Sequence, residues 1–202
     1  MAPVRAFFVG LVLVAVAAGS SHAQPQGERL RGIVTALAGL ELTLTTRDGR
    51  NLKLTLAADY GVMEVAPFDR KAIAPGHFVG IGAHPAAGGA LTAVQVVVFP
   101  ESMRGTGEGH RPWDVVPEGT MTNAAVAAAV EASDGRSVTL KLPDRSVQIA
   151  IGAGVTPVTF YPADRALLKV GANVVLTATK AADGALKAAR ILVGKDGFVP
   201  PI

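Results

Sequence analysis

The residues best suited to chemistry gather in one segment near the middle of the chain. This segment holds the protein's single tryptophan, a histidine, and several carboxylates and arginines, whereas a plain flexible spacer would be mostly Gly, Ser or Pro. The candidate binding residues in and beside it are Glu101, Met103, Arg104, Glu108, His110, Arg111, Trp113, Asp114, Met121 and Asn123. So many chemically active side chains predict either a ligand site or a rigid contact between two domains.

A metal ion is one ligand that this segment could hold. His110, Glu108 and Asp114 offer nitrogen and oxygen donors, and Met103 or Met121 could add a soft sulfur. A donor set of His and Met outside the cytoplasm suits copper better than zinc, so copper or another divalent ion is the cofactor that the pattern suggests. Against this, the segment contains no second histidine, and one histidine seldom holds a transition metal alone.

The same segment could instead bind an anion or simply hold two domains together. Gly105, Gly107 and Gly109 would let backbone N–H groups approach a ligand, while Arg104 and Arg111 could clamp a carboxylate or phosphate. In the competing interpretation, the tryptophan packs against both domains and the charges pair with one another. The sequence leaves both interpretations open.

Catalysis has less support than binding. Ser102 lacks the Gly-x-Ser-x-Gly context of an exposed nucleophile, and no Walker lysine or dinucleotide fingerprint accompanies the glycines. Glu101 and Glu108 could act as acid and base only if the loop held them at a fixed separation. We therefore expect a non-enzymatic protein, with hydrolysis by these linker carboxylates as the weaker alternative.

Composition excludes several other classes. The chain of 202 residues has no cysteine, which removes disulfides, thiolate nucleophiles and cysteine-ligated metal sites. Its formal net charge is +3, but the lysines and arginines are scattered singly and do not form the runs that follow a phosphate backbone. Aromatic residues make up only 5% and offer few platforms for stacked bases. No nucleic-acid partner is expected.

The N-terminus has the pattern of a secretory signal peptide over residues 1–23. Arg5 precedes an apolar run over 6–18, and small residues at Ser21 and Ala23 form a cleavage site. The run is too short for a spanning helix, and no second apolar run follows, so we expect no membrane span in the mature chain. The mature protein is expected in the periplasm or secreted.

The mature chain repeats itself at a constant separation. The matched segments are 67–70 with 162–165, 75–81 with 170–176, and 89–93 with 184–188, while 42–56 and 138–151 match more loosely. Agreement of three segments in one register predicts an internal duplication.

Alternation of apolar and polar residues predicts that both copies consist of β-strands. Asp-Gly and Gly-Gly pairs separate the alternating runs, as hairpin turns do. Each copy would hold about five strands, with one short helical turn after the third, which is the outline of an OB-like barrel. Ala124 to Ala132 is rich in alanine, a good helix former, but its match to the strand at 31–38 predicts a strand.

The repeated block also resembles a known family. The pattern is a glycine-led first strand and a hairpin, followed by a closing block at 76–96 and 171–191 that contains Gly-x-Leu-x-Ala in both copies. This pattern resembles a family of exported bacterial OB-like β-barrel domains of uncharacterised function, here in tandem duplicate. The resemblance implies a fold and a compartment, but no activity and no catalytic residues.

These observations predict an all-β protein of two tandem, small, OB-like five-stranded barrels joined by a Gly-rich linker. The predicted parts are a signal peptide at 1–23, a first module at 28–100, the linker at 101–119, a second module at 120–195 and a tail at 196–202. We expect a binding or adaptor protein whose linker recognises a small ligand, a metal ion or an envelope protein. The alternative is a structural component of an envelope assembly with no small ligand.

Overall fold

The computed structural model describes residues 27–86, 90–113, 115–132 and 135–201. The predicted signal peptide at 1–23 lies outside these ranges. The described residues form an all-β fold without an α-helix, and none of their helical turns is long and apolar enough to cross a membrane. The strands are β1 (Glu28–Ala38), β2 (Glu41–Thr46), β3 (Asn51–Pro67), β4 (Phe78–Pro85), β5 (Leu91–Phe99), β6 (Gly109–Pro112), β7 (Thr120–Ala132), β8 (Gly135–Lys141), β9 (Ser146–Gly152), β10 (Val158–Ala163), β11 (Asn173–Lys180) and β12 (Leu186–Gly194). Short 3-10 turns are η1 (Arg70–Ala72), η3 (Glu101–Met103), η4 (Arg165–Leu167) and η5 (Lys195–Gly197).

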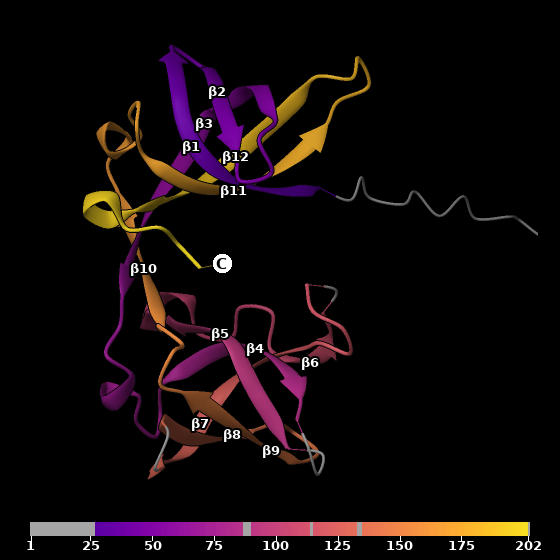
Figure 1. Cartoon of the computed structure of the whole chain (residues 1–202), viewed down its shortest axis with the longest axis vertical. Coiled ribbons are helices and arrows are strands. Elements are labelled where there is room, and N and C mark those ends of the chain that lie inside the picture. Colours follow the sequence, from indigo (N-terminus) through magenta and orange to yellow (C-terminus); the bar gives the residue numbers. More distant parts are fainter. Residues whose placement is uncertain (1–26, 87–89, 114, 133–134, 202) are drawn as a thin grey trace, which may run out of the picture.

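Five strands close a mixed barrel, at the top of Figure 1. β12, β11, β1, β2 and β3 pair in that order as antiparallel neighbours, and a long parallel pairing of β12 with β3 closes the ring. Alternate residues of each strand point inward, so that leucines such as Leu30, Leu44 and Leu56 fill the interior at 1% exposure or less. The barrel core is therefore built from β-branched and leucine side chains, as the alternating sequence predicted.

The strands of the barrel come from both halves of the chain, which corrects the prediction of two barrels closed by consecutive strands. β1 to β3 lie in the predicted module 28–100, but β11 and β12 lie in the module 120–195. The reason is the length of β3, which runs through 17 residues and carries the chain out of the barrel. β4 and β5 then pair with strands of the other half.

The second group of strands is β4, β5, β7, β8 and β9, at the bottom of Figure 1. They pair antiparallel in the order β5, β4, β7, β8 and β9, and a short parallel contact at Leu91↔Ile149 and Thr92↔Ala150 links β9 to β5. A separate core lies among them, with Ile81, Leu140 and Ile149 fully buried. β7 includes the alanine-rich segment 124–132, so the prediction of a strand there is confirmed.

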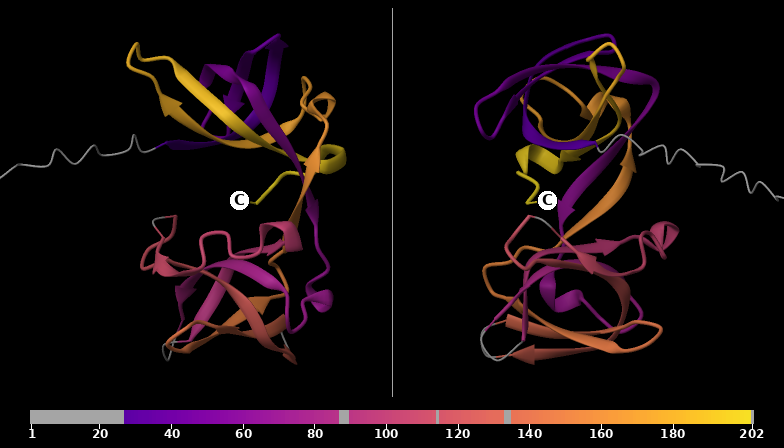
Figure 2. Two further views of the ribbon diagram at one scale, coloured as in Figure 1. Left: turned by 180° about the vertical axis from the view of Figure 1, so that it is seen from behind. Right: turned by 90° about the vertical axis from the view of Figure 1, so that its right-hand side faces the viewer.

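Two antiparallel strands, β3 and β10, connect the barrel to the second group along one side, as both views in Figure 2 show. Their pairing runs from Val158↔Pro67 to Ala163↔Val62 and includes Phe160↔Val65. Val65, Phe160 and Val175 form a third buried cluster between the two cores.

Two arginines secure the exchange of strands between the halves. Arg165 donates to the carbonyl oxygens of Tyr60 and Ala58 at 3.0 and 3.1 Å, and its guanidinium lies 4.1 Å from the centre of the Tyr60 ring. Arg70 does the same in the opposite direction, donating to the carbonyl of Ala153 at 3.0 Å. Arg165 thus binds the backbone of β3 from the other half of the chain, and Arg70 binds the backbone just after β9.

The aspartates before these arginines cap the 3-10 turns. Asp69 accepts from the backbone N–H of Lys71, and Asp164 accepts from that of Ala166. The Asp-Arg pair is therefore a local structural device at both places, in which the carboxylate caps the turn and the guanidinium reaches across the molecule.

Candidate functional site

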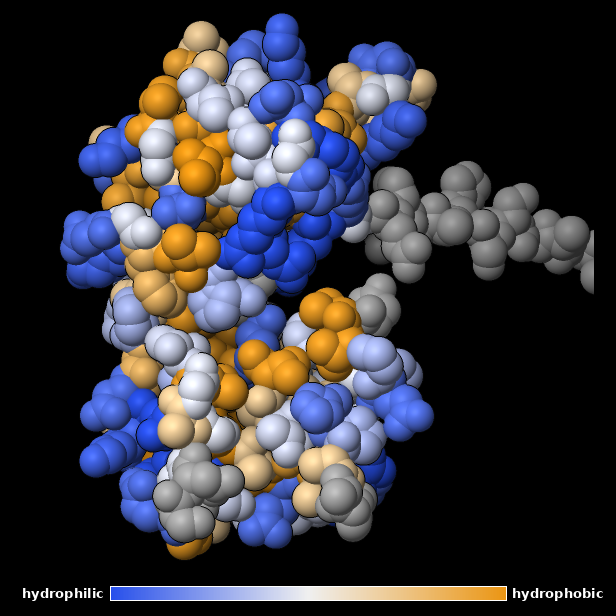
Figure 3. All heavy atoms as spheres, in the orientation of Figure 1, coloured by the Kyte–Doolittle hydropathy of each residue, from blue (hydrophilic) through white to orange (hydrophobic). Residues whose placement is uncertain are grey.

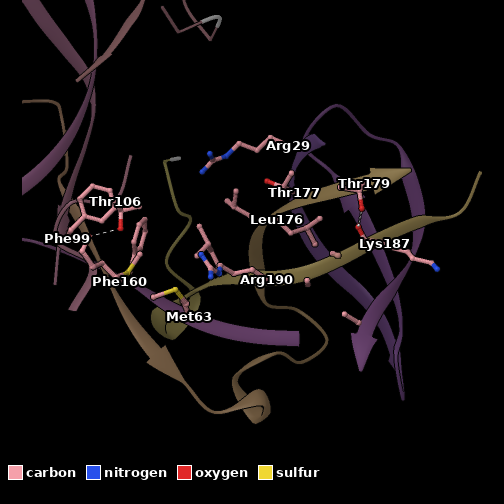
Figure 4. Close-up of a pocket in the computed structure, with 16 residues that line it drawn as sticks. Arg29, Met63, Phe99, Thr106, Phe160, Leu176, Thr177, Thr179, Lys187 and Arg190 are labelled. Carbon is pink, nitrogen blue, oxygen red and sulfur yellow. Dashed lines mark hydrogen bonds between the residues drawn. The ribbon is translucent and has the colours of Figure 1, made fainter. Parts of the chain in front are cut away.

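A cavity of about 530 Å³ lies where the barrel faces the second group of strands. Figure 4 shows barrel residues on one side of it and Phe99, Thr106 and Phe160 on the other. Its lining residues are Arg29, Ala57, Met63, Phe99, Met103, Thr106, Phe160, Val175, Leu176, Thr177, Thr179, Lys187, Ala188, Ala189, Arg190 and Leu192. Most of these side chains are apolar, the charged ones are all cations, and none is a carboxylate.

The apolar part of the cavity wall is formed by the third buried cluster and by the hydrophobic side chains packed against it. Phe160 is 8% exposed and meets Phe99 edge-on, with the ring centres 6.1 Å apart. Met63, Met103 and Leu192 pack around this cluster. Because flexible methionines and aromatic rings adapt to apolar molecules of different shapes, this wall suits an apolar ligand.

An irregularity in β12 places a cation in the cavity. The register between β12 and β3 shifts between Ala188 and Arg190, so that Ala189 and Arg190 are both exposed while Ala188 and Ile191 are buried. Strand irregularities of this kind change the direction of a side chain. Figure 4 shows the guanidinium groups of Arg190 and Arg29 directed toward the gap, whereas the amine of Lys187 extends away from it.

Arg29 and Arg190 are distinguished from the other arginines by their lack of partners. Within the described ranges, the side chain of neither makes a hydrogen bond, an ion pair or a ring contact. Every other arginine in those ranges has such an interaction, for example Arg47 with the carbonyl of Pro200 and Arg104 with Glu101. The two arginines without partners thus both line the same cavity.

Arg29 also lies near other arginines of the barrel. It lines a hollow with Arg31, Arg47, Arg50 and the carboxylate Asp48, and Figure 3 shows strongly hydrophilic side chains gathered where the barrel borders the cleft. Desolvation lowers the pKa of the Arg29 guanidinium from its usual value, and repulsion by Arg31 lowers it further. An anion placed beside Arg29 would offset the repulsion by Arg31.

The predicted linker is not a spacer, because it folds back onto the second group of strands. Its residues form η3 and then β6, which pairs with β7 from Gly109↔Asn123 to Pro112↔Thr120. Of the nine predicted binding residues that the structure describes, only Met103 lines the cavity. Thr106 of the linker, which the sequence did not single out, lines it too and accepts at its carbonyl from the Asn123 side chain at 2.9 Å.

The predicted arginines of the linker are used within the protein. Arg104 donates to Glu101 at 2.8 Å and to the carbonyl of Gly76 at 2.6 Å. Arg111 donates to the carbonyl of Gly107 at 2.8 Å. Both guanidinium groups thus have hydrogen-bond partners within the protein.

Trp113 packs on the second group of strands. A Cβ atom built on Gly82 would lie 2.4 Å from its ring, so the glycine is what allows this contact. The Trp113 side chain is half-buried, and Met121 is the β7 neighbour of Gly82 in the β4–β7 register. In the structural interpretation the tryptophan packs against two domains, and the contact with Gly82 is one such contact.

The predicted metal ligands do not meet in the described ranges. His110 forms a hydrogen bond of 2.7 Å with the hydroxyl of Thr122, and desolvation lowers its pKa, with repulsion by Arg145 adding to the effect. Glu108 is exposed, and Asp114 lies outside the described residues. Within those residues no group of three or more His, Asp or Glu side chains is arranged to hold a metal ion.

The fold defines a five-stranded mixed β-barrel protein with seven further strands. Comparison of the chain with protein-family models, curated proteins and solved structures finds no match in any of the three. The family resemblance carried by 76–96 and 171–191 therefore stays a prediction.

Proposed function

We propose that this chain is an exported, non-enzymatic binding protein whose ligand site is the cavity between the barrel and the second group of strands. The single observation that carries the proposal is the apolar lining of that cavity. Its volume of about 530 Å³ falls within the range of roughly 300–1,000 Å³ that is usual for small-molecule sites. The proposal of export rests on the predicted signal peptide at 1–23.

The chemistry of the lining supports binding without catalysis. The polar side chains around the cavity are three cations and three threonines. A reaction would need a nucleophile with a base, or an acid and base pair, near the ligand. The groups that line the cavity supply hydrogen bonds and positive charge, which orient a ligand.

We also infer that the second group of strands is a second barrel of an OB-like repeat, with strands exchanged between the copies. Two observations support this inference. The contact of Arg70 with Ala153 corresponds to that of Arg165 with Ala58, because the repeat matches Arg70 to Arg165 and Ala153 to Ala58. The β3–β10 pairing is likewise reciprocal, since Val65 and Phe160 are matched positions and face each other.

The binding proposal is tested with the uncharged fluorescent probe N-phenyl-1-naphthylamine. We expect its fluorescence to rise in a saturable way when it is mixed with the folded mature protein. The variant Ala189→Trp should weaken this binding at least tenfold, because the exposed Ala189 lines the cavity and an indole would fill it. Ala182→Trp is the matched control, since Ala182 is also exposed but lies in the β11–β12 hairpin, outside the lining.

Two results would contradict the proposal. One is the absence of saturable probe binding to the folded protein. The other is equal binding by the Ala189→Trp and Ala182→Trp variants, which would place the probe elsewhere. Either result would favour the alternative of an assembly component without a small ligand.

A further inference from the structure

We propose that the ligand of this cavity is an amphiphile with an apolar chain and an anionic head that binds Arg29 and Arg190. This inference rests on the proposed function, since it names the ligand class for the same site. It requires an apolar wall, a set of uncompensated cations beside it, and an arrangement in which one molecule touches both. The cavity provides all three.

The first step of the argument is charge complementarity. The lining contains Arg29, Lys187 and Arg190 but no aspartate or glutamate. Several other arginines of the described ranges are paired with a carboxylate, as Arg50 is with Glu28 and Asp48 at 2.8 Å. A cavity that collects only positive charge favours an anion over a neutral or cationic ligand.

The second step is the lack of partners for the two guanidinium groups. A guanidinium group presents several N–H donors in a planar fork that matches a carboxylate or a phosphate. Arg29 and Arg190 have no side-chain partner in the described ranges, so these donors are free to bind an anion. Binding therefore forms charge-assisted hydrogen bonds without breaking existing ones.

The third step is the division of the cavity into a polar and an apolar part. Arg29 comes from β1 and Arg190 from β12, on the barrel side, and Met63, Phe99 and Phe160 come from the connecting strands and the second group. Figure 4 shows the two guanidinium groups directed toward the gap before these apolar side chains. A head group at the arginines would thus place an attached chain against the aromatic wall.

The test compares molecules that share one chain and differ in their heads. Dodecanoate, dodecyl phosphate, dodecan-1-ol and dodecyltrimethylammonium are each used below micelle-forming concentrations to displace N-phenyl-1-naphthylamine. We expect the anions to displace the probe at concentrations at least about tenfold lower than the alcohol, and the cation to be the weakest. The comparison of dodecanoate with dodecyl phosphate separates a carboxylate head from a phosphate head.

The role of the two arginines is tested by a ratio of two dissociation constants, that of dodecan-1-ol divided by that of dodecanoate. In a double variant with Arg29→Gln and Arg190→Gln, this ratio should fall to about twofold or less. Arg145→Gln is the matched control, because Arg145 is an exposed arginine of the second group whose side chain pairs with Asp144 and does not line the cavity. Its ratio should equal that of the unmodified protein, and thermal unfolding of each variant checks that it is folded.

The outcomes separate this inference from the proposed function. Equal displacement by dodecan-1-ol and dodecanoate, or an unchanged ratio in the double variant, would overturn the anionic head while leaving an apolar binding site intact. Absence of probe binding in every protein would overturn the proposed function itself. An anion preference that weakens with added salt would agree with the partly exposed position of both arginines.

Discussion

Cutting the chain between its two halves should not separate them. A specific protease site inserted between Gly105 and Thr106, in the exposed turn after η3, would allow the cut after folding. If each half closed its own barrel, the pieces would part as two small domains. Because β11 and β12 complete a barrel with β1 to β3, we expect the cut protein to remain one particle.

The magnitude follows from the side chains that each half buries in the other's core. Val174, Leu176, Ile191 and Val193 enter the barrel core from the C-terminal half, and Val79, Ile81, Val96 and Val98 enter the second core from the N-terminal half, each at most 4% exposed. Each such side chain contributes about 1.5–3 kcal/mol, so the two sets together contribute about 12–24 kcal/mol. Association costs about 4–15 kcal/mol, and central values leave about 8 kcal/mol, a dissociation constant near 1 µM.

Size-exclusion chromatography of the cut protein measures the outcome. At about 50 µM, well above that dissociation constant, the two fragments should elute together in native buffer and apart in urea. The uncut insertion protein is the control for any effect of the added sequence. Two separate peaks in native buffer, each with the circular dichroism of folded β-structure, would refute the exchange of strands.

Three further perturbations have defined outcomes. Gly32→Ala should destabilise the protein by about 3 kcal/mol or more, because the new Cβ would lie 2.1 Å from the Thr45 carbonyl oxygen. Gly61→Ala should be tolerated, because a Cβ there has nothing within 4 Å, and urea unfolding measures the stability of both variants. Arg165→Ala and Arg70→Ala should each cost about 1–2 kcal/mol through lost hydrogen bonds to carbonyl oxygens, and a loss no larger than that of the exposed Lys169→Ala would contradict the role of these arginines. The pKa of His110 is lowered in the folded protein, so the unfolded chain binds a proton at this histidine more readily than the folded chain does. The neutral His110 therefore contributes stability above the ordinary histidine pKa, and this stability is lost as the pH falls from that value toward the lower pKa of the folded chain. The melting temperature of His110→Gln should accordingly fall less on acidification than that of the unmodified protein, and equal slopes in the two proteins would rule this out.

Local patterns in the sequence were sufficient to predict the strands but not their partners. The match of 124–132 to the strand at 31–38 predicted β7 correctly in spite of the helix preference of alanine, and Ala124 and Val126 are buried in it. Partner choice depends on where the chain goes after the third strand. In the first half, β3 continues without a break through Gly61, whereas in the second half β9 ends at Gly152 and β10 begins at Val158.

The cavity could not be predicted because its lining exists only after the strands are exchanged. Arg29 and Arg190 are far apart in the sequence, and each resembles any outward-facing cation in an alternating strand. The linker was predicted to hold the site because it contains many charged and metal-ligating side chains. Several of these side chains instead make contacts that hold the linker in place, as Arg104 does with Glu101. The local density of reactive side chains corresponds to a folded segment, whereas the site that we propose draws its lining mainly from other parts of the chain.

Substitutions in the two parts of the cavity wall should differ in their effect on the stability of the fold. This difference affects which residues can change to give a new binding specificity. Phe160 packs between the two cores, so its replacement would disturb the connection of the barrel to the second group as well as any ligand. Arg29 and Arg190 are exposed and their side chains have no partner in the described ranges, so their replacement removes no hydrogen bond or ion pair within the protein. The apolar wall is thus needed for folding, whereas we expect that Arg29 and Arg190 can be replaced without disturbing the fold. Substitution of these two arginines is therefore the sharper test of function, because a change in binding would not be confused with a loss of stability.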